Sequence, residues 1–512
     1  MKFCSTRGGS AGSTFEEAVS RGYAPDGGLY VPEQLPRLSL AELSLWQQLD
    51  FPSLQEEILK LFVGDELSAA ELSEVVRGSY SCFSAPEIVP VVPLPGMTES
   101  TPGQDPPIFI AELFHGPTFC FKDLGLQPLV RLLARLAENR GSKRTFLVST
   151  TGDTGPAAMR AVADAGSSRL RIVVFFPEGQ ISELQRRQMT TTMSAPDAKV
   201  QTARVASFEG GGDDMDLPLK RLGVDSDFAE RHGLCGINSY NLGRPVCQMA
   251  HYFWSYFRAV DKLGAEMGTP IDIAVPSGAL GNLAAGFMAR QMGLPLRRLV
   301  AGVNSNDITH RTIESGEFHR SEHMEKTLSD AINIQVPYNM ERVFYYLTDE
   351  DPALVKSWMT EMDTSGKLTL APEWIERLQA IFGSCRVDDD AMCSAMRRAL
   401  DEHGYLSDPH TAVGLAAAWA VYCSGKNAEL SAPAAVVVLA TASPCKFQAS
   451  VTEAVGATRW AAYQAGPGFP QAARAAMAAQ EQPLGRLIAQ GSLQESHRAW
   501  ETEVRLMLEN AA

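Results

Sequence analysis

Short apolar segments that alternate with helical segments constrain the fold of this chain more than any other feature. Strand-like runs rich in β-branched and aromatic residues lie at residues 145–149, 171–176, 271–275, 299–303 and 436–439. Helical patterns separate them, including an Ala-rich stretch from Pro156 and a second stretch at residues 283–292. Strands separated by helices predict an α/β domain with a mainly parallel sheet.

Size, charge and cysteine usage limit the class of protein. The chain has 512 residues, enough for two or three domains. Its formal net charge of −15 argues against non-specific nucleic-acid binding, which depends on basic surfaces. The nine cysteines form no CxxC pair, and the sequence shows neither a signal-peptide core nor a run of about 18 apolar residues. We therefore expect a cytoplasmic protein that binds neither nucleic acid nor membranes.

Three turns follow predicted strands, at residues 149–155, 276–282 and 441–447. In a parallel sheet such turns gather at the carboxyl edge, where ligands bind. The first turn precedes a helix and suits an anion, but it also suits a plain helix cap. The second has two glycines that let the backbone approach a phosphate closely, although it matches neither GxGxxG nor a P-loop. The third offers Thr441 and Lys446 to an anion, or it is a solvent-facing loop.

Lys122 lies among aromatic and apolar neighbours in the segment at residues 114–123. An apolar setting disfavours a charged amine, and a neutral amine can form a Schiff base. The alternative is a surface lysine whose stem covers apolar groups and whose amine pairs with Asp123. Composition alone favours this alternative.

The segment from His319 to His323 matches H-x-x-E-H, a zinc-peptidase pattern. Such a site needs a largely buried helix and a third ligand downstream. The neighbouring residues here are charged, with Glu314, Glu317 and Glu325 close by. A solvated helix face explains the pattern more simply, and we expect no metal site.

Taken together, these segments resemble threonine synthase and its threonine synthase-like relatives, which are pyridoxal 5′-phosphate (PLP) enzymes with the tryptophan-synthase β-subunit fold. The resemblance covers most of the chain, and the motifs follow the family's order and spacing. Residues 5–7, 15–18 and 24–32 resemble the family's small N-terminal domain. The other matching motifs are FHGPTFCFKD at 114–123, TGDTG at 151–155, PSGALGN at 276–282 and DPHTAVG at 408–414.

The resemblance implies a two-lobed α/β fold with parallel-rich sheets and a small N-terminal domain. It divides the chain into an N-terminal domain at residues 1–93, a PLP-dependent catalytic domain at 94–465 and a C-terminal helical tail at 466–512. It leaves the oligomeric state as a monomer or a homodimer.

Residue roles follow from the same resemblance. Lys122 would carry PLP as a Schiff base and shuttle protons, and Thr441 would face the pyridine nitrogen. The loop that cradles the cofactor phosphate would consist of Gly278, Ala279, Leu280, Gly281 and Asn282. The substrate-binding residues would be Thr150, Thr151, Asp153 and Thr154 for the substrate carboxylate, and Arg244 and Lys446 for a phosphate group.

The implied substrate is a small phosphorylated amino acid, O-phosphohomoserine, and the implied product is threonine. Some positions depart from the family pattern: Thr151 replaces a serine, Ser443 a histidine and Leu242 a tryptophan. Thr441 and Asp408, in contrast, follow the biosynthetic enzymes. We therefore predict loss of phosphate with formation of threonine.

Three alternatives remain open. The segments at 306–312 and 334–342 resemble the animal threonine synthase-like branch, and some members of that branch are phospholyases that give 2-oxobutyrate, phosphate and ammonia. A serine or threonine dehydratase is a second alternative, which the long N-terminal domain and Lys446 argue against. A catalytically inactive secreted or scaffold relative is the third, and the intact Lys122 and Gly-rich loop argue against it.

Overall fold

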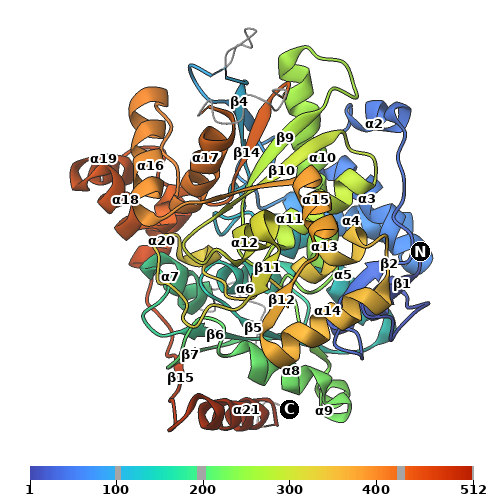
Figure 1. The fold of residues 1–512 in the computed structure, drawn as a ribbon. Coiled ribbons are helices and arrows are strands. Elements are labelled where there is room, and N and C mark those ends of the chain that lie inside the picture. The colour runs from blue at the N-terminus through green and yellow to red at the C-terminus, as the bar shows by residue number, and fades with distance from the viewer. Residues whose placement is uncertain (98–104, 193–202, 424–432, 510–512) are drawn as a thin grey trace.

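Two β-sheets, one above the other in Figure 1, form the two lobes of the molecule. The computed structural model describes residues 1–97, 105–192, 203–423 and 433–509. The upper sheet has the strand order β13-β10-β9-β14-β4-β3, and the lower sheet has the order β15-β7-β6-β5-β8. Only β3 pairs antiparallel within these two sheets. The predicted two-lobed α/β fold with parallel-rich sheets is thus confirmed.

Apolar strands lie at the centre of each sheet. The upper sheet consists of β3 (Val91–Pro93), β4 (Ile108–Glu112), β9 (Ile271–Pro276), β10 (Leu296–Val303), β13 (Phe382–Arg386) and β14 (Val436–Ala440). The lower sheet consists of β5 (Arg144–Ser149), β6 (Leu170–Pro177), β7 (Ala203–Phe208), β8 (Leu234–Cys235) and β15 (Gly485–Leu487). Every residue of β9 and β14 is buried, as expected for strands covered by helices on both faces.

The N-terminal segment packs beside both lobes. It holds a two-stranded antiparallel sheet and four helices whose N-caps are Ser, Thr or Asp, the first of them between the two strands in sequence. Its elements are β1 (Phe3–Ser5), α1 (Phe15–Arg21), β2 (Tyr30–Pro32), α2 (Leu40–Trp46), α3 (Phe51–Val63), a 3₁₀ turn (Gly64–Glu66) and α4 (Ala69–Tyr80).

Helix α10 (Gly243–Leu263) lies at the centre of the helical packing and contacts α3, α5 and α11. The other helices between residues 122 and 291 are α5 (Lys122–Arg140), α6 (Thr154–Ala165), α7 (Glu183–Thr192), α8 (Asp216–Val224), α9 (Ser226–His232) and α11 (Gly281–Gln291). The middle of the chain adds α12 (Ile308–Ser315), β11 (Glu317–His319), a 3₁₀ turn (Asp330–Ile332), α13 (Met340–Leu347), α14 (Pro352–Ser365), β12 (Lys367–Thr369) and α15 (Pro372–Ile381).

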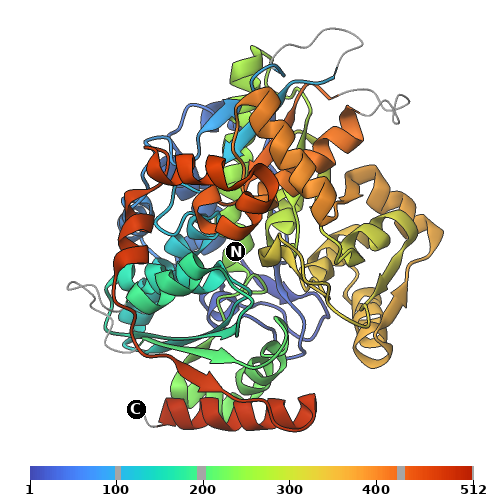
Figure 2. The same ribbon diagram turned by 90° about the vertical axis from the view of Figure 1, so that its left-hand side faces the viewer.

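The last part of the chain returns to both lobes. Its elements are α16 (Asp389–His403), α17 (Pro409–Tyr422), a 3₁₀ turn (Pro444–Lys446), α18 (Gln448–Val455), α19 (Ala457–Ala465), α20 (Gln471–Ala478) and α21 (Leu493–Glu509). Between the last two helices, β15 pairs with β7, so the segment predicted as a helical tail also supplies a strand to the lower sheet. Figure 2 shows α21 below that sheet, and α21 contacts α8.

The first residues of the DPHTAVG motif start helix α17. Asp408 is the N-cap of α17, where its carboxylate accepts hydrogen bonds from the backbone N–H groups of His410 and Thr411. Pro409 occupies the first helical position, which lacks an N–H partner in any helix.

No helix in the described parts of the chain is both long enough and apolar enough to cross a bilayer.

Candidate functional site

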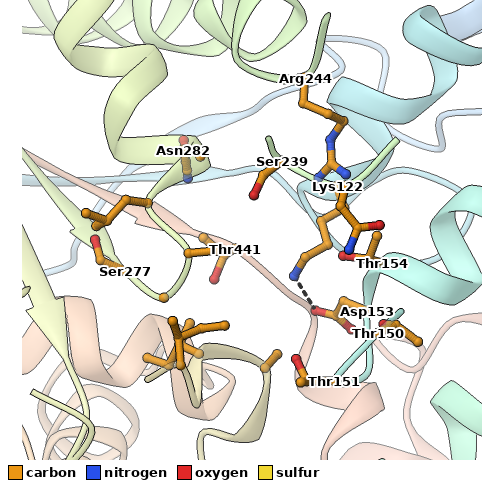
Figure 3. A pocket seen from close by; sticks show the side chains of 18 of the residues that line it. Lys122, Thr150, Thr151, Asp153, Thr154, Ser239, Arg244, Ser277, Asn282 and Thr441 are labelled. Atoms are coloured by element: carbon orange, nitrogen blue, oxygen red, sulfur yellow. Dashed lines mark ion pairs between the residues drawn. The ribbon is translucent and has the colours of Figure 1, made fainter. Parts of the chain in front are cut away.

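The predicted turns meet at one pocket, but they come from two sheets rather than one. The turns after β9 and β14 belong to the upper sheet, and the turn after β5 belongs to the lower sheet. Together with the N-terminus of α5, they surround the cavity in Figure 3. The site therefore lies between the carboxyl ends of two sheets, not at the edge of one sheet.

Lys122, the first residue of α5, reaches into this pocket with a side chain that is 14% exposed. Its Nζ lies 3.7 Å from Oδ2 of Asp153 and 4.9 Å from the ring centroid of Phe121. The backbone N–H of Phe121 donates to the carbonyl of Thr441 at 2.8 Å, which fixes the start of α5 against the end of β14. Figure 3 shows the amine pointing towards Asp153, between the two lobes.

The neighbouring Asp123 does not form the ion pair with Lys122 that a surface lysine would make. Its side chain is fully buried and accepts hydrogen bonds from the hydroxyl and the N–H of Thr118 at 2.7 and 2.8 Å. Asp123 instead shapes the loop that carries Lys122. The alternative of a surface lysine paired with Asp123 is therefore wrong.

The loop at residues 276–282 turns sharply into α11. Leu280 has φ of +60°, a left-handed conformation, and the helix begins at Gly281. The first N–H groups of this 11-residue helix have no intrahelical acceptor and face the pocket, an arrangement that suits a phosphate. A Cβ at Gly278 would lie 2.9 Å from Cα of Ile332, and one at Gly281 would lie 2.6 Å from Cβ of Ser239. Both glycines are thus required by close packing of the loop itself.

Asn282 gives this loop a polar side chain that faces the pocket. Its Oδ1 lies 2.9 Å from Nε2 of His251, while its buried Nδ2 has no hydrogen-bond partner among the described residues. A buried amide donor without a partner is costly unless a ligand accepts from it. The loop at residues 276–282 therefore has a hydrogen-bond donor without an acceptor on the side where a phosphate would lie.

Asp153, at the start of α6, lies between two lysines. Its Oδ1 is 2.8 Å from Nζ of Lys446, and Nε2 of Gln185 donates to the same oxygen at 2.9 Å. Burial opposes ionisation, but Lys446 and Lys122 hold the pKa of Asp153 well below its ordinary value. The carboxylate is therefore charged at neutral pH.

Lys446 is fully buried behind Asp153 and is not among the residues that line the pocket. Its Nζ also donates to the carbonyl of Thr118 at 2.8 Å. Although burial works against it, Asp153 raises the pKa of Lys446. The alternative of a solvent-facing loop is therefore wrong at this position, because Lys446 forms a buried ion pair.

Arg244 lines the pocket from the first turn of α10 and is 2% exposed. Its Nη1 donates to the carbonyl of Ile237 at 3.0 Å, and its buried Nε has no partner among the described residues. Burial lowers the pKa of Arg244 to about 10, so the group stays protonated at neutral pH. The pocket thus contains a buried cation with hydrogen-bonding capacity to spare.

The threonines predicted for the site also line the pocket. Oγ1 of Thr150 accepts the N–H groups of Gly152 and Gly155 at 3.0 and 3.1 Å and so shapes the turn before α6. The positions Thr151, Thr154 and Thr441 face the same cavity in Figure 3. Ser443, in contrast, caps a 3₁₀ turn and is not among the lining residues.

Further polar side chains that sequence reasoning did not assign to the site also line the pocket, among them Asp213, Asp216, Ser239 and His410. The two aspartates follow β7, the fourth strand whose carboxyl end reaches the site. A Gly-Gly-Gly-Asp-Asp sequence directly after an apolar strand was the available signal. Burial and the neighbouring Asp213 raise the pKa of Asp216 to about 8, so its carboxyl group is mostly neutral at pH 7.

The H-x-x-E-H segment is not helical. His319 ends strand β11, which pairs with β12, and the imidazole contacts the guanidinium of Arg311. The expected helix was wrong because pairing with a strand distant in sequence overrides the local pattern. Within the described ranges, no group of three or more His, Cys, Asp or Glu side chains could hold a metal ion.

Family models match most of the chain. The model described as Threonine synthase N terminus matches residues 2–80, Pyridoxal-phosphate dependent enzyme matches 85–442, and Threonine synthase, C-terminal matches 411–484. The chain belongs to the threonine synthase family of PLP-dependent enzymes.

Individual relatives agree with this assignment. Threonine synthase-like 2 of Homo sapiens is 38% identical over 416 residues, which are 81% of this chain and 82% of the relative. Threonine synthase of Saccharomyces cerevisiae is 33% identical over 465 residues, 86% of each chain. The X-ray structure of PLP-bound threonine synthase from Brucella melitensis has a TM-score of 0.83 and 31% identity, and the match covers 99% of both chains.

The chain is accordingly a PLP-dependent enzyme with PLP as its cofactor. The groups that line the pocket are also chemically suited to bind PLP. It combines an amine, a helix N-terminus preceded by tightly packed glycines, an amide donor without a partner, and a hydroxyl at the end of β14.

Proposed function

We propose that this enzyme releases phosphate from O-phosphohomoserine and forms threonine, with Lys122 as the residue that carries PLP. The observation that supports this most is the presence of two separate anion sites in one pocket. One is the N-terminus of α11, assigned to the cofactor phosphate. The other combines the buried Arg244 with the N-terminus of α6, and it is available to an anionic substrate.

Each part of the site has a proposed role in holding the ligands. Gly278, Ala279, Leu280, Gly281 and Asn282 bind the cofactor phosphate through backbone N–H groups and the free amide of Asn282. Thr441 bonds to the ring nitrogen. Thr150, Thr151, Asp153 and Thr154 surround the substrate carboxylate, and Arg244 binds the substrate phosphate. Lys446 contributes through Asp153, because its amine already bonds to that carboxylate.

Lys122 is the proposed acid–base group of the reaction. Bound PLP supplies the electron sink that makes the substrate's α-proton removable. The amine of Lys122 takes this proton and later returns protons to the carbon skeleton as phosphate departs. Asp153, 3.7 Å from the amine and ionised, orients it. Water then adds at the β carbon, so that one O-phosphohomoserine and one water give threonine and phosphate.

A second candidate shares every step up to phosphate loss. If water is not delivered to the β carbon, one O-phosphohomoserine and one water, which hydrolyses the released imine, give 2-oxobutyrate, ammonia and phosphate. The 38% identity to threonine synthase-like 2, against 33% to the yeast threonine synthase, supports this candidate. We favour threonine because Thr441 and Asp408 keep the pattern of the biosynthetic enzymes.

The substrate assignment is tested by phosphate release from O-phosphohomoserine, with L-serine and L-threonine as competing substrates. We expect phosphate release that the Lys122→Ala variant abolishes, and little 2-oxo acid from serine or threonine. Turnover of serine or threonine alone would instead indicate a dehydratase. A protein that binds no PLP and turns over none of the three would indicate an inactive relative.

We also propose a cytoplasmic enzyme. All nine cysteines are free, as expected for a reducing compartment. The predicted monomer or homodimer and the three-part domain division stay predictions.

A further inference from the structure

Arg342, in the first turn of α13, is a fully buried cation behind the phosphate-binding loop. Its Nε and Nη2 donate to the carbonyl of Tyr30 at 3.2 and 3.1 Å. Its Nη2 also donates to the carbonyl of Tyr240 at 2.6 Å, and its Nη1 to the carbonyl of Ser239 at 3.3 Å. One further bond joins Nη1 to Oδ1 of Asn339 at 2.6 Å. The guanidinium thus bonds to three carbonyls and one amide oxygen.

Asn339 connects this arginine to the loop. While its Oδ1 accepts from Arg342, its Nδ2 donates to the carbonyl of Ala279 at 3.0 Å and to Oγ of Ser239 at 3.1 Å. Ala279 lies in the middle of the loop, and Ser239 packs against Gly281 at its end. Asn339 is itself fully buried, so no water competes for these bonds. One amide side chain therefore connects Arg342 to the loop at Ala279 and to Ser239, the residue that packs against the end of the loop.

The same guanidinium also holds the N-terminal segment. Tyr30 begins β2, and its carbonyl receives two of the bonds from Arg342. Ser239 and Tyr240 belong to the loop that precedes α10 and reaches the pocket. Three segments distant in sequence are therefore aligned by one side chain.

The charge of Arg342 is not balanced by a hydrogen-bonded carboxylate among the described residues. The adjacent Glu341 bonds instead to Thr6 and to Arg7, with Arg7 Nη2 at 2.9 Å. Burial lowers the pKa of Arg342 to about 10, which still leaves the group protonated at neutral pH. A buried cation without a paired anion is unfavourable by itself, and a nearby anion offsets that cost.

We propose that Arg342 and Asn339 are positioning residues for the cofactor phosphate: they hold the Gly278–Asn282 loop in its binding shape and supply a positive charge behind it. The inference rests on the proposed assignment of this loop to the cofactor phosphate. It gives the Asn339-to-Arg342 stretch a role in cofactor binding. It also makes the N-terminal segment a structural part of the cofactor site, through the carbonyl of Tyr30.

The test measures PLP binding rather than turnover. Holoenzyme is dialysed to equilibrium to obtain the dissociation constant of PLP, and the ³¹P resonance of the bound cofactor phosphate is recorded. Arg342→Met removes the charge and all five bonds, so we expect the dissociation constant to rise at least about tenfold and the resonance to shift. Arg342→Lys keeps the charge but not the planar set of donors, so its effect should be smaller. Asn339→Ala should also weaken binding, because it removes the side-chain bonds to Ala279 and Ser239 and leaves only the backbone N–H of Asn339 on the Ala279 carbonyl, at 3.4 Å.

Arg7→Met is the matched control. It breaks the neighbouring ion pair between the N-terminal segment and α13 but removes no bond to the loop. We expect it to lower stability and to leave PLP affinity and the ³¹P resonance unchanged. Equal effects of Arg7→Met and Arg342→Met would reduce Arg342 to a purely structural role and overturn the proposal.

Unchanged PLP affinity in a folded Arg342→Met protein would also overturn it. Should that variant fail to fold, Arg342→Lys and Asn339→Ala decide the question by the same two measurements. Failure of the proposed function looks different, since the wild-type protein would then bind PLP without releasing phosphate from O-phosphohomoserine.

Discussion

The pocket wall that comes from the upper sheet and the wall that comes from the lower sheet are built from different kinds of group. The upper wall offers backbone N–H groups, packed glycines and the hydroxyl of Thr441. The lower wall carries ionisable side chains: the buried Asp153 after β5, and the partly exposed Asp213 and Asp216 after β7. Lys122 lies between the two walls.

This difference matches two separate tasks. A cofactor phosphate stays bound through many turnovers, so rigid neutral donors suit it. A substrate enters, changes charge and leaves, which requires groups that can hold or exchange protons. Under the proposed function, the upper wall would bind the cofactor phosphate, and the lower wall together with Arg244 of α10 would handle the substrate.

The largest expected effect is at the residue that both walls share. Lys122→Ala should lower the rate of phosphate release by at least about 10³-fold, because it removes the proposed proton-transfer group. In the wild-type protein, borohydride reduction followed by peptide mapping should place PLP on Lys122 alone. Label on Lys446, or on no lysine, contradicts the assignment.

The lower wall should depend strongly on its hidden ion pair. Lys446→Met leaves Asp153 buried without its nearest counter-charge, and we expect a loss of about 3–5 kcal/mol in the free energy of unfolding. Chemical denaturation measures this loss. The double variant Lys446→Met/Asp153→Asn should recover much of it. A single variant that stays fully stable but has a raised KM would instead place Lys446 on the substrate phosphate.

The upper wall should also respond to the shape of its phosphate-binding loop. Gly281→Val brings a side chain against Ser239, where even a Cβ would lie 2.6 Å from Cβ of that residue. We expect the dissociation constant of PLP to rise about tenfold with the fold retained. Gly223→Val in α8 is the control, because a Cβ there meets no heavy atom within 4 Å. Equal PLP affinity in both variants would remove the loop from the cofactor site.

A further expected effect is a pH dependence that belongs to the lower wall. Burial and Asp213 raise the pKa of Asp216 to about 8 in the folded protein, whereas an unfolded aspartate titrates near pH 4. Between pH 4 and pH 8, Asp216 binds a proton in the folded protein but not in the unfolded chain. The contribution of Asp216 to the free energy of unfolding therefore falls as the pH rises through this range. Unfolding measured across this range should show a shallower decline in Asp216→Asn. Parallel curves would mean that Asp216 is ionised in the folded protein.

The upper wall was also the easier wall to predict from sequence. Its strands are continuous apolar runs, and its loop carries a glycine pattern that is local in the chain. The predicted strand at residues 271–275 corresponds to β9 (Ile271–Pro276), and Lys122 was identified by its own motif. Local sequence suffices where backbone conformation and short-range spacing create the function.

The lower wall depends on contacts between distant residues. Lys446 meets the carbonyl of Thr118 across 328 positions of sequence, and no local pattern indicates that its amine is buried. The same holds behind the upper wall, where the bond between Arg342 and the carbonyl of Tyr30 joins residues 312 positions apart. The motif that begins at His319 was wrongly predicted to be helical, because His319 ends strand β11, which pairs with β12. Burial and long-range pairing determine these features, and neither can be read from spacing.

The central claim is tested most directly by the stoichiometry of products from O-phosphohomoserine in a single reaction. Free phosphate, threonine and 2-oxobutyrate are quantified together over a full time course of the PLP-loaded wild-type enzyme. The account predicts that phosphate and threonine appear in equal amounts and that 2-oxobutyrate is a minor product. Equal amounts of phosphate and 2-oxobutyrate would replace the synthase with the phospholyase, and the absence of phosphate would contradict the account as a whole.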